Sequence, residues 1–315
     1  MVSERTLIGG QAPHQLVAHL NGLRPHLAAA IKGQDHVLDR VCSVLTRGEL
    51  GMAHPRRPKG SLLFVGPTGT GKTEMTNVFT AYLHGGAKPV RFDMSEYQLQ
   101  KSVDKLIGEN TGDGGLLGRI LRGVTCGTLL FDEIEKAHPL VLDLFLQVLE
   151  DARITLATGE VLDLRGFYVV CTSNIGSEES MRMESAPFAS IERTVLMRVR
   201  ERLRPELVGR ISEIIVFGRL NYSTQRAICE DMVTAEIARL GGFGHRVEAG
   251  ADTIEFLVRQ GYHRTLGARP MRGAVERNLQ EAVAANLLAA KSGNGRLTVD
   301  ERSWELKLTA VDSLK

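Results

Sequence analysis

The chain has 315 residues, of which 43% are hydrophobic and 24% charged, a composition typical of a globular protein with one large and one smaller domain. Its net charge of +2 gives no electrostatic reason to expect nucleic acid as a partner, and no apolar run approaches the roughly 18 residues of a membrane span. The four cysteines lie far apart and the nine histidines show no metal-site spacing, so we expect reduced thiols, a cytoplasmic protein and no structural metal.

The chain before residue 60 predicts a tail, two helices and a loop. Residues 1–13 are polar and contain glycine, and we expect a flexible tail there. Helical spacing follows over residues 14–31 and 34–50. The segment 54–60, HPRRPKG, is expected to be a loop because its two prolines break helices, and its basic residues favour a solvated connector.

A strand, a glycine-rich loop and a helix are expected between residues 61 and 83. Residues 62–65 are apolar and predict a buried strand, and a helix is expected over 74–83. Between them GPTGTGKT satisfies the pattern G-x-x-x-x-G-K-[ST]. Its glycines let backbone N–H groups converge on phosphates, its lysine reaches the β and γ oxygens, and its last hydroxyl can ligate Mg²⁺. We therefore expect a nucleoside triphosphate site formed by Gly66, Pro67, Thr68, Gly69, Thr70, Gly71, Lys72 and Thr73.

Strands and helices continue to alternate up to about residue 174. This order predicts a parallel α/β sheet that helices cover on both faces. The expected elements are strands over 89–93, 129–131 and 167–172, an amphipathic helix over 138–150, and a hairpin over 154–164 with Gly159 near its turn.

The character of the chain changes after Phe217, and we place a domain boundary near residues 218–221. We expect a nucleotide-binding α/β domain over 14–219 and a small mixed α/β domain over 220–315. In the second domain the pattern predicts helices over 223–240, 252–260 and 270–290, and short strands near residues 246–247, 297 and 306.

Two carboxylates stand where the expected third strand ends, in the stretch TLLFDE at 128–133. In a parallel sheet this end lies beside the phosphate loop. Asp132 would hold the hydration shell of Mg²⁺, and Glu133 would act as general base on the attacking water. An acidic turn or helix cap is the alternative for Asp-Glu alone. Asn174, after the neighbouring strand, would contact the γ-phosphate or orient that water, and a plain turn role is equally compatible with an isolated Asn.

These motifs resemble the AAA+ ATPases of the Clp chaperone family, and within it the second ATPase module of ClpB-type disaggregases and ClpA-type unfoldases. The resemblance implies a P-loop α/β domain followed by a small mixed α/β lid domain, ATP and Mg²⁺ as cofactors, and ATP hydrolysis. The matching stretches run in family order over nearly the whole chain: IKGQDHV (31–37), GPTGTGKTE (66–74), RFDMSEY (91–97), LFDEIEKAHP (130–139), LQVLEDARIT (146–155), TSNIGS (172–177), LRPELVGRI (203–211) and LGARPMR (266–272).

The resemblance also assigns nucleotide-binding residues outside the phosphate loop. Ile31 and Lys32 stand where the family has its adenine-contacting loop. Asn174 matches the family's first sensor, and Arg269 matches the second sensor, which the small domain carries to the γ-phosphate. The expected nucleotide-binding set also includes Ile228.

Arg210 matches the family's arginine finger, which reaches the ATP of a neighbouring subunit. On the residues alone it is one more arginine in an arginine-rich stretch. A charged planar fork suits a phosphoryl group that gains negative charge, so the physics agrees with the assigned role. An arginine supplied in trans implies head-to-tail contacts between subunits, and we expect a nucleotide-dependent homohexameric ring.

One stretch departs from the family's pattern. Members that thread polypeptides carry an aromatic loop, roughly G-Y-V-G, shortly after the L-I-G that is 106–108 here. This chain reads LIGENTGDGGLLG over 106–118, so residues 110–113 stand where the family has the aromatic residue that holds the polypeptide, an aromatic grip that is missing here. General threading of polypeptides is therefore not expected. The sequence also shows no first ATPase module, coiled-coil insertion or N-terminal substrate domain. It has no Ile-Gly-Phe or Ile-Gly-Leu tripeptide between residues 174 and 204, so no Clp peptidase partner is expected.

Three uses of an ATPase cycle remain open. The first is a protein-remodelling motor that acts on one dedicated partner, such as a component of a secretion or conjugation machine. The second is a nucleotide-gated assembly scaffold with slow hydrolysis, against which the intact Glu133 and Asn174 argue. The third, least favoured, is a nucleic-acid remodeller, because the chain has neither a basic stripe nor a helix-turn-helix.

Overall fold

The computed structural model describes residues 13–300 and 302–310. The expected N-terminal tail lies outside the described residues, apart from Pro13, which begins the first helix. Contacts divide the chain into two compact units, one that runs to Phe217 and one that begins at Gly218, with the four residues Pro67–Thr70 grouped with the second unit.

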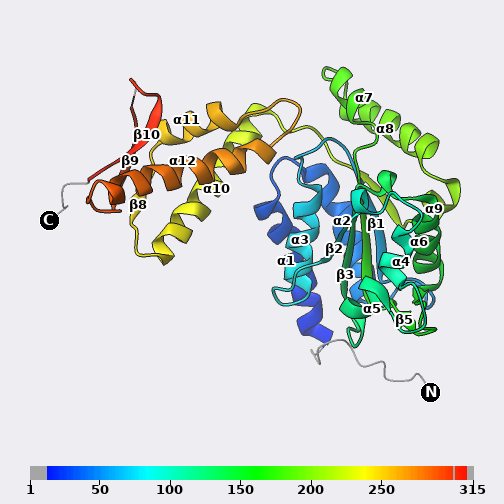
Figure 1. The fold of residues 1–315 in the computed structure, drawn as a ribbon. Helices are drawn as coiled ribbons and strands as arrows, with labels where there is room; N and C mark the ends of the chain where they lie inside the picture. The colour runs from blue at the N-terminus through cyan, green and yellow to red at the C-terminus, as the bar shows by residue number, and fades with distance from the viewer. Residues whose placement is uncertain (1–12, 301, 311–315) are drawn as a thin grey trace. The chain divides into compact units, whose positions relative to one another are not determined.

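A five-stranded sheet forms the centre of the first unit (Figure 1). Its strands follow the order β2-β3-β6-β1-β7. Every neighbouring pair of strands is parallel, as the alternation of strands and helices predicts. The strands β1 and β6 are buried along their whole length, which explains their predominantly apolar sequences. The strands are β1 (Gly60–Val65), β2 (Val90–Asp93), β3 (Gly127–Asp132), β6 (Phe167–Ser173) and β7 (Glu213–Val216).

Helices cover both faces of this sheet because alternate residues of each strand point to opposite sides. Leu62 and Phe64 of β1 belong to one apolar core, and Leu63 and Val65 belong to the other. The first core is completed by α1 (Pro13–Ala30), α2 (Asp35–Glu49) and α3 (Lys72–Leu83). The second is completed by α4 (Ser102–Ile107), α5 (Gly115–Leu121), α6 (Pro139–Asp151), α8 (Phe188–Arg202), α9 (Pro205–Arg210) and the antiparallel hairpin of β4 (Arg153–Thr155) and β5 (Val161–Asp163).

Several short elements of the first unit were not predicted from the sequence. The strand β7 has only four residues, and the helices α4, α5, α9 and α7 (Ser177–Arg182) have six or seven, too few to show a period. Two short 3-10 turns, η1 (Met94–Glu96) and η2 (Ile134–Lys136), follow β2 and β3. The expected hairpin at 154–164 is present, and Gly159 adopts φ +82° between its strands.

Phe131→Ala is expected to lower the free energy of unfolding of the first unit by about 3–5 kcal/mol. Phe131 is 2% exposed, and its ring centroid lies 5.2 Å from that of Phe92 and 4.2 Å from that of Phe145. Truncation would leave a cavity between the sheet and α6. Denaturant unfolding measures the loss, and Val161→Ala, at a position that is 53% exposed, should change the same quantity by less than about 0.5 kcal/mol.

The second unit packs three helices against a small mixed sheet. The helix α10 (Tyr222–Gly242) is capped by Asn221, whose side chain accepts from the Thr224 N–H, and α11 (Ala251–Gly261) and α12 (Arg269–Leu288) follow. In the sheet, β9 (Gly295–Asp300) pairs parallel with β8 (Val247–Glu248) and antiparallel with β10 (Glu305–Thr309). Among the described residues of both units, no helix combines the length and apolarity that crossing a bilayer requires.

Candidate functional site

The glycine-rich loop turns the chain sharply from β1 into α3. Gly66, Gly69 and Gly71 all adopt positive φ, at +141°, +73° and +101°. A side chain is excluded at Gly66, where a Cβ would lie 2.6 Å from the carbonyl oxygen of Phe217. Gly71 is the N-cap of α3 and offers no side-chain cap, and the N-terminus of a helix favours an anion. This backbone has the conformation that a phosphate cradle needs.

Hydrogen bonds connect the three strand ends that carry the predicted residues. Lys72, at the start of α3, is buried, and its Nζ donates to the carbonyl oxygen of Gly66 (2.5 Å) and to Oδ1 of Asn174 (3.0 Å). Asn174 Nδ2 in turn donates to Oε1 of Glu133 (3.0 Å). The adjacent strands β1, β6 and β3 end at these residues, so the sheet order places them together. One amide group thus links the loop lysine to the expected general base.

Glu133 is held from several sides. Its φ of +58° is rare for a residue with a side chain and costs on the order of 1–3 kcal/mol, a strain found most often at functional sites. Its backbone N–H donates to Thr172 Oγ1 at 3.1 Å. Its second carboxylate oxygen pairs with Lys136 Nζ at 2.5 Å, and this hydrogen bond and charge raise the pKa of Lys136. The carboxylate is therefore oriented by an amide on one oxygen and an ammonium on the other.

Asp132 ends β3 and is almost fully buried. The Thr172 hydroxyl donates to its Oδ1, and Arg91 Nη2 lies 2.5 Å from its Oδ2. Carboxylate and hydroxyl oxygens are the donors that Mg²⁺ prefers, so Asp132 and Thr73 fit the ion chemically. In the described ranges, no group of three or more His, Cys, Asp and Glu side chains is placed to hold a metal.

Sequence reasoning did not name Arg91, Lys136 or Thr172 as site residues. Each stands inside a stretch that matched the family, RFDMSEY, LFDEIEKAHP or TSNIGS, and that placement was the available signal. Asp93, two residues after Arg91, caps η1 through bonds to Ser95, and these bonds lower the pKa of the Asp93 carboxyl.

The predicted nucleotide-binding residues outside the phosphate loop are divided between the two units. Ile31 follows α1, is 4% exposed, and its Cγ2 lies 3.8 Å from the position that a Cβ on Gly71 would take. Lys32 is the next residue and is half-buried. Ile228 lies half-buried on α10, and Arg269 is the first residue of α12, both in the second unit.

Arg210 lies at the opposite end of the sheet from the phosphate loop of its own chain. It is the last residue of α9, and its carbonyl oxygen accepts from Ser61 Oγ at the start of β1, at 3.3 Å. The loop follows the other end of this six-residue strand, about 17–20 Å away. The guanidinium pairs instead with Glu150 at 2.9 Å. The structure therefore does not bring Arg210 to the site that Lys72, Asn174 and Glu133 form.

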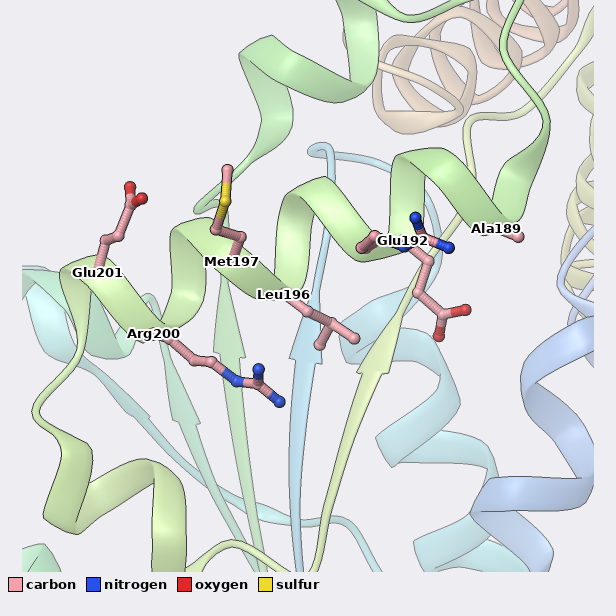
Figure 2. Close-up of a pocket in the computed structure, with 7 residues that line it drawn as sticks. Ala189, Glu192, Leu196, Met197, Arg200 and Glu201 are labelled. Carbon is pink, nitrogen blue, oxygen red and sulfur yellow. The ribbon is translucent and has the colours of Figure 1, made fainter.

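An open surface hollow lies along one face of α8 and contains none of the predicted site residues (Figure 2). Charged side chains of both signs flank Leu196 and Met197 there, and Met197 is 49% exposed. The lining residues are Ala189, Glu192, Arg193, Leu196, Met197, Arg200 and Glu201.

Comparison with known families gives two matches in chain order. Residues 57–214 match the AAA domain (Cdc48 subfamily), and residues 220–299 match the C-terminal, D2-small domain of ClpB protein. Among solved structures, the chain is similar to a chain of a closed-state cryo-electron-microscopy reconstruction of Hsp104 with ATPγS and FITC casein. The TM-score is 0.85 and the sequence identity 28%, over 96% of this chain and 53% of that one.

Curated relatives show the same likeness. Heat shock protein 100 of Trypanosoma brucei brucei is 37% identical over 278 residues, which are 86% of this chain and 32% of the relative. A ClpA homolog of Porphyra purpurea is 37% identical over 92% of this chain and 38% of the relative. Chaperone protein ClpB of Agrobacterium fabrum is 35% identical over 87% of this chain and 32% of the relative. The chain thus spans about a third of the length of these relatives.

Proposed function

This chain belongs to the AAA+ ATPases of the Clp chaperone family, and we propose that it hydrolyses ATP as a ring-forming motor that remodels a dedicated protein partner. The membership confirms the family and the fold class that the sequence motifs indicate. The observation that carries the proposed activity is the hydrogen-bonded series from Lys72 through Asn174 to Glu133, at the end of β1 where the phosphate loop begins.

The geometry supports a separate catalytic or binding role for each side chain of the site. Lys72 would exchange its bonds to Gly66 and Asn174 for the β and γ oxygens of the triphosphate. Asn174 would then be free to orient water, and Glu133 would accept the water's proton. Asp132 and Thr73 would hold Mg²⁺, which neutralises charge on the phosphates when it is bound. Adenine contacts from Ile31 and Lys32, a nucleotide contact from Ile228 and a phosphate contact from Arg269 belong to the same proposal.

The position of Arg210 supports a ring. Because about 17–20 Å of strand separates it from its own phosphate loop, Arg210 can serve as an arginine finger only in the site of another subunit. A closed homohexamer is the assembly that we propose. Arg210 would add positive charge to the transferring phosphoryl group of the neighbour.

The loop that replaces the aromatic grip is short and polar, and this supports a dedicated partner. Asn110 Oδ1 accepts from the Gly112 N–H and Asp113 Oδ1 accepts from the Gly115 N–H, each at 2.9 Å. Gly108 adopts φ +98°, and a Cβ there would lie 1.8 Å from the Asp113 carbonyl oxygen. A loop fixed in this way offers specific polar contacts, where an aromatic ring offers broad apolar area. A component of a secretion or conjugation machine is one such partner; the Clp peptidase and nucleic acid are not part of the proposal.

We place the protein in the cytoplasm, where its four free cysteines would stay reduced.

Steady-state ATP turnover as a function of protein concentration tests the proposed function. A ring with a trans-acting residue requires specific activity that rises steeply with concentration and then reaches a plateau. Turnover that is independent of concentration would mean that each subunit works alone. Nucleotide binding with no turnover at any concentration would instead favour a nucleotide-gated scaffold.

Lys72→Met is expected to weaken ATP binding by about tenfold to a hundredfold, because it removes charge-assisted hydrogen bonds to the phosphates. A fluorescent ATP analogue titrated into the protein measures the affinity. Lys88→Met is the control, since Lys88 is exposed between α3 and β2, and it should leave the affinity within twofold, about 0.4 kcal/mol. Equal affinities of the Lys72 variant and the wild type would contradict the proposed phosphate site.

A further inference from the structure

Arg91 occupies the carboxylate that the proposed function gives to Mg²⁺. It lies on β2, the edge strand of the sheet, opposite Leu130 of β3, and its side chain extends to Asp132 two residues further along. Its Nη2 lies 2.5 Å from Asp132 Oδ2, and the Thr172 hydroxyl holds Oδ1. Both oxygens of the carboxylate therefore have partners within the protein.

The two partners of Asp132 differ in how easily they can leave. Thr172 is 1% exposed and fixed within β6, so its hydroxyl stays beside Asp132. The side chain of Arg91 is 51% exposed, while that of Asp132 is 12% exposed. A long side chain on an edge strand can swing into water at small cost, because its charge is rehydrated there. Of the two, Arg91 is the exchangeable partner.

A guanidinium and a hydrated divalent cation beside the same carboxylate repel each other, because both are positively charged. We propose that Arg91 is a built-in counter-ion that holds Asp132 while the site is empty and leaves it when Mg²⁺ arrives with the nucleotide. This inference rests on the proposed function. It makes Arg91 a positioning residue, which sets how much Mg²⁺ the site needs and keeps the buried carboxylate paired between cycles.

The Mg²⁺ requirement of nucleotide binding tests this competition. The probe is a fluorescent, non-hydrolysable ATP analogue, titrated at a series of Mg²⁺ concentrations and also without Mg²⁺. Arg91→Met removes the charge and keeps most of the stem, and it should reach half-maximal Mg²⁺-dependent binding at about threefold to tenfold lower Mg²⁺. Arg91→Lys keeps a competing cation and should stay within twofold of wild type. Arg153→Met removes a similarly exposed arginine of β4, paired with Asp151 at the end of α6, and should also stay within twofold.

A second readout follows the ion pair itself. In the ligand-free wild-type protein, the side-chain N–H resonances of Arg91, assigned through their loss in Arg91→Lys, should move when Asp132 is replaced by Asn. They should move again when the analogue is added with Mg²⁺, and much less when it is added without Mg²⁺. Resonances that respond to neither change would overturn the inference, as would an unchanged or higher Mg²⁺ requirement in Arg91→Met.

The same titrations distinguish an error in the proposed ATP site from an error in the role of Arg91. If the analogue binds neither with nor without Mg²⁺, the proposed ATP site is wrong and the inference falls with it. If the analogue binds, and Arg91→Met needs as much Mg²⁺ as wild type, only the role of Arg91 is wrong.

Discussion

Glu133→Gln is expected to lower ATP turnover by about a hundredfold to ten-thousandfold and to leave nucleotide binding nearly unchanged. Glutamine keeps the Oε1 acceptor that Asn174 bonds at 3.0 Å, and it has nearly the same volume. It cannot accept a proton from water, and it loses the ion pair with Lys136. Steady-state turnover and equilibrium binding of ATP, measured on the same preparation, separate the two effects.

Glu135 is the alternative candidate for the general base. It lies two residues further on, and its Oε1 accepts from the backbone N–H of Asn174 at 3.0 Å, so it supports the site through the chain's backbone. Glu135→Gln should lower turnover by no more than about tenfold. The change weakens one hydrogen bond, to the Asn174 N–H, which is worth about 1 kcal/mol, and it leaves Glu133 in place as the proton acceptor. A larger loss of turnover in Glu135→Gln than in Glu133→Gln would mean that Glu135, and not Glu133, is the general base.

Local patterns in the sequence were enough to predict the phosphate loop and the strands around it. β1 and β6 are predominantly apolar because both faces are buried, and the loop motif carries its own spacing of glycines, lysine and threonine. α8 shows the limit of this approach. Only Val195 and Val199 are buried along it, and its exposed arginines obscure the helical period, so the sequence pattern predicts no element between residues 175 and 217.

The partners within the site depend on strand order, which the sequence does not display. Glu133 and Asn174 are 41 residues apart and meet because β3 and β6 are neighbours, with Phe131 opposite Cys171. Arg91 reaches Asp132 for a similar reason, through the pairing of β2 with β3. The resemblance to the family named the expected roles. The ion pair of Arg91 emerges only when the strands are placed side by side, whereas Lys136 pairs with Glu133 three residues before it in the chain.

Arg210→Ala is expected to lower turnover by about a thousandfold, because an arginine finger contributes on the order of 10³ or more to phosphoryl transfer. The fold should tolerate the change, since the pair with Glu150 is partly exposed and worth about 1 kcal/mol or less. Arg204→Ala is the matched control. It removes a neighbouring arginine, paired with Asp143 and 41% exposed, and should keep turnover within twofold.

Mixing Arg210→Ala with Glu133→Gln separates a trans-acting arginine from any role in its own chain. A site in an Arg210→Ala subunit keeps its own Glu133 and regains an arginine when the neighbour is the Glu133→Gln variant. In randomly mixed rings of equal parts, about one interface in four has this composition, so turnover should rise well above that of either variant alone. Energy transfer between labelled subunits shows that the rings have exchanged. Exchange without recovery would mean that Arg210 acts within its own subunit, which the length of β1 makes physically difficult, or that it has no role in hydrolysis.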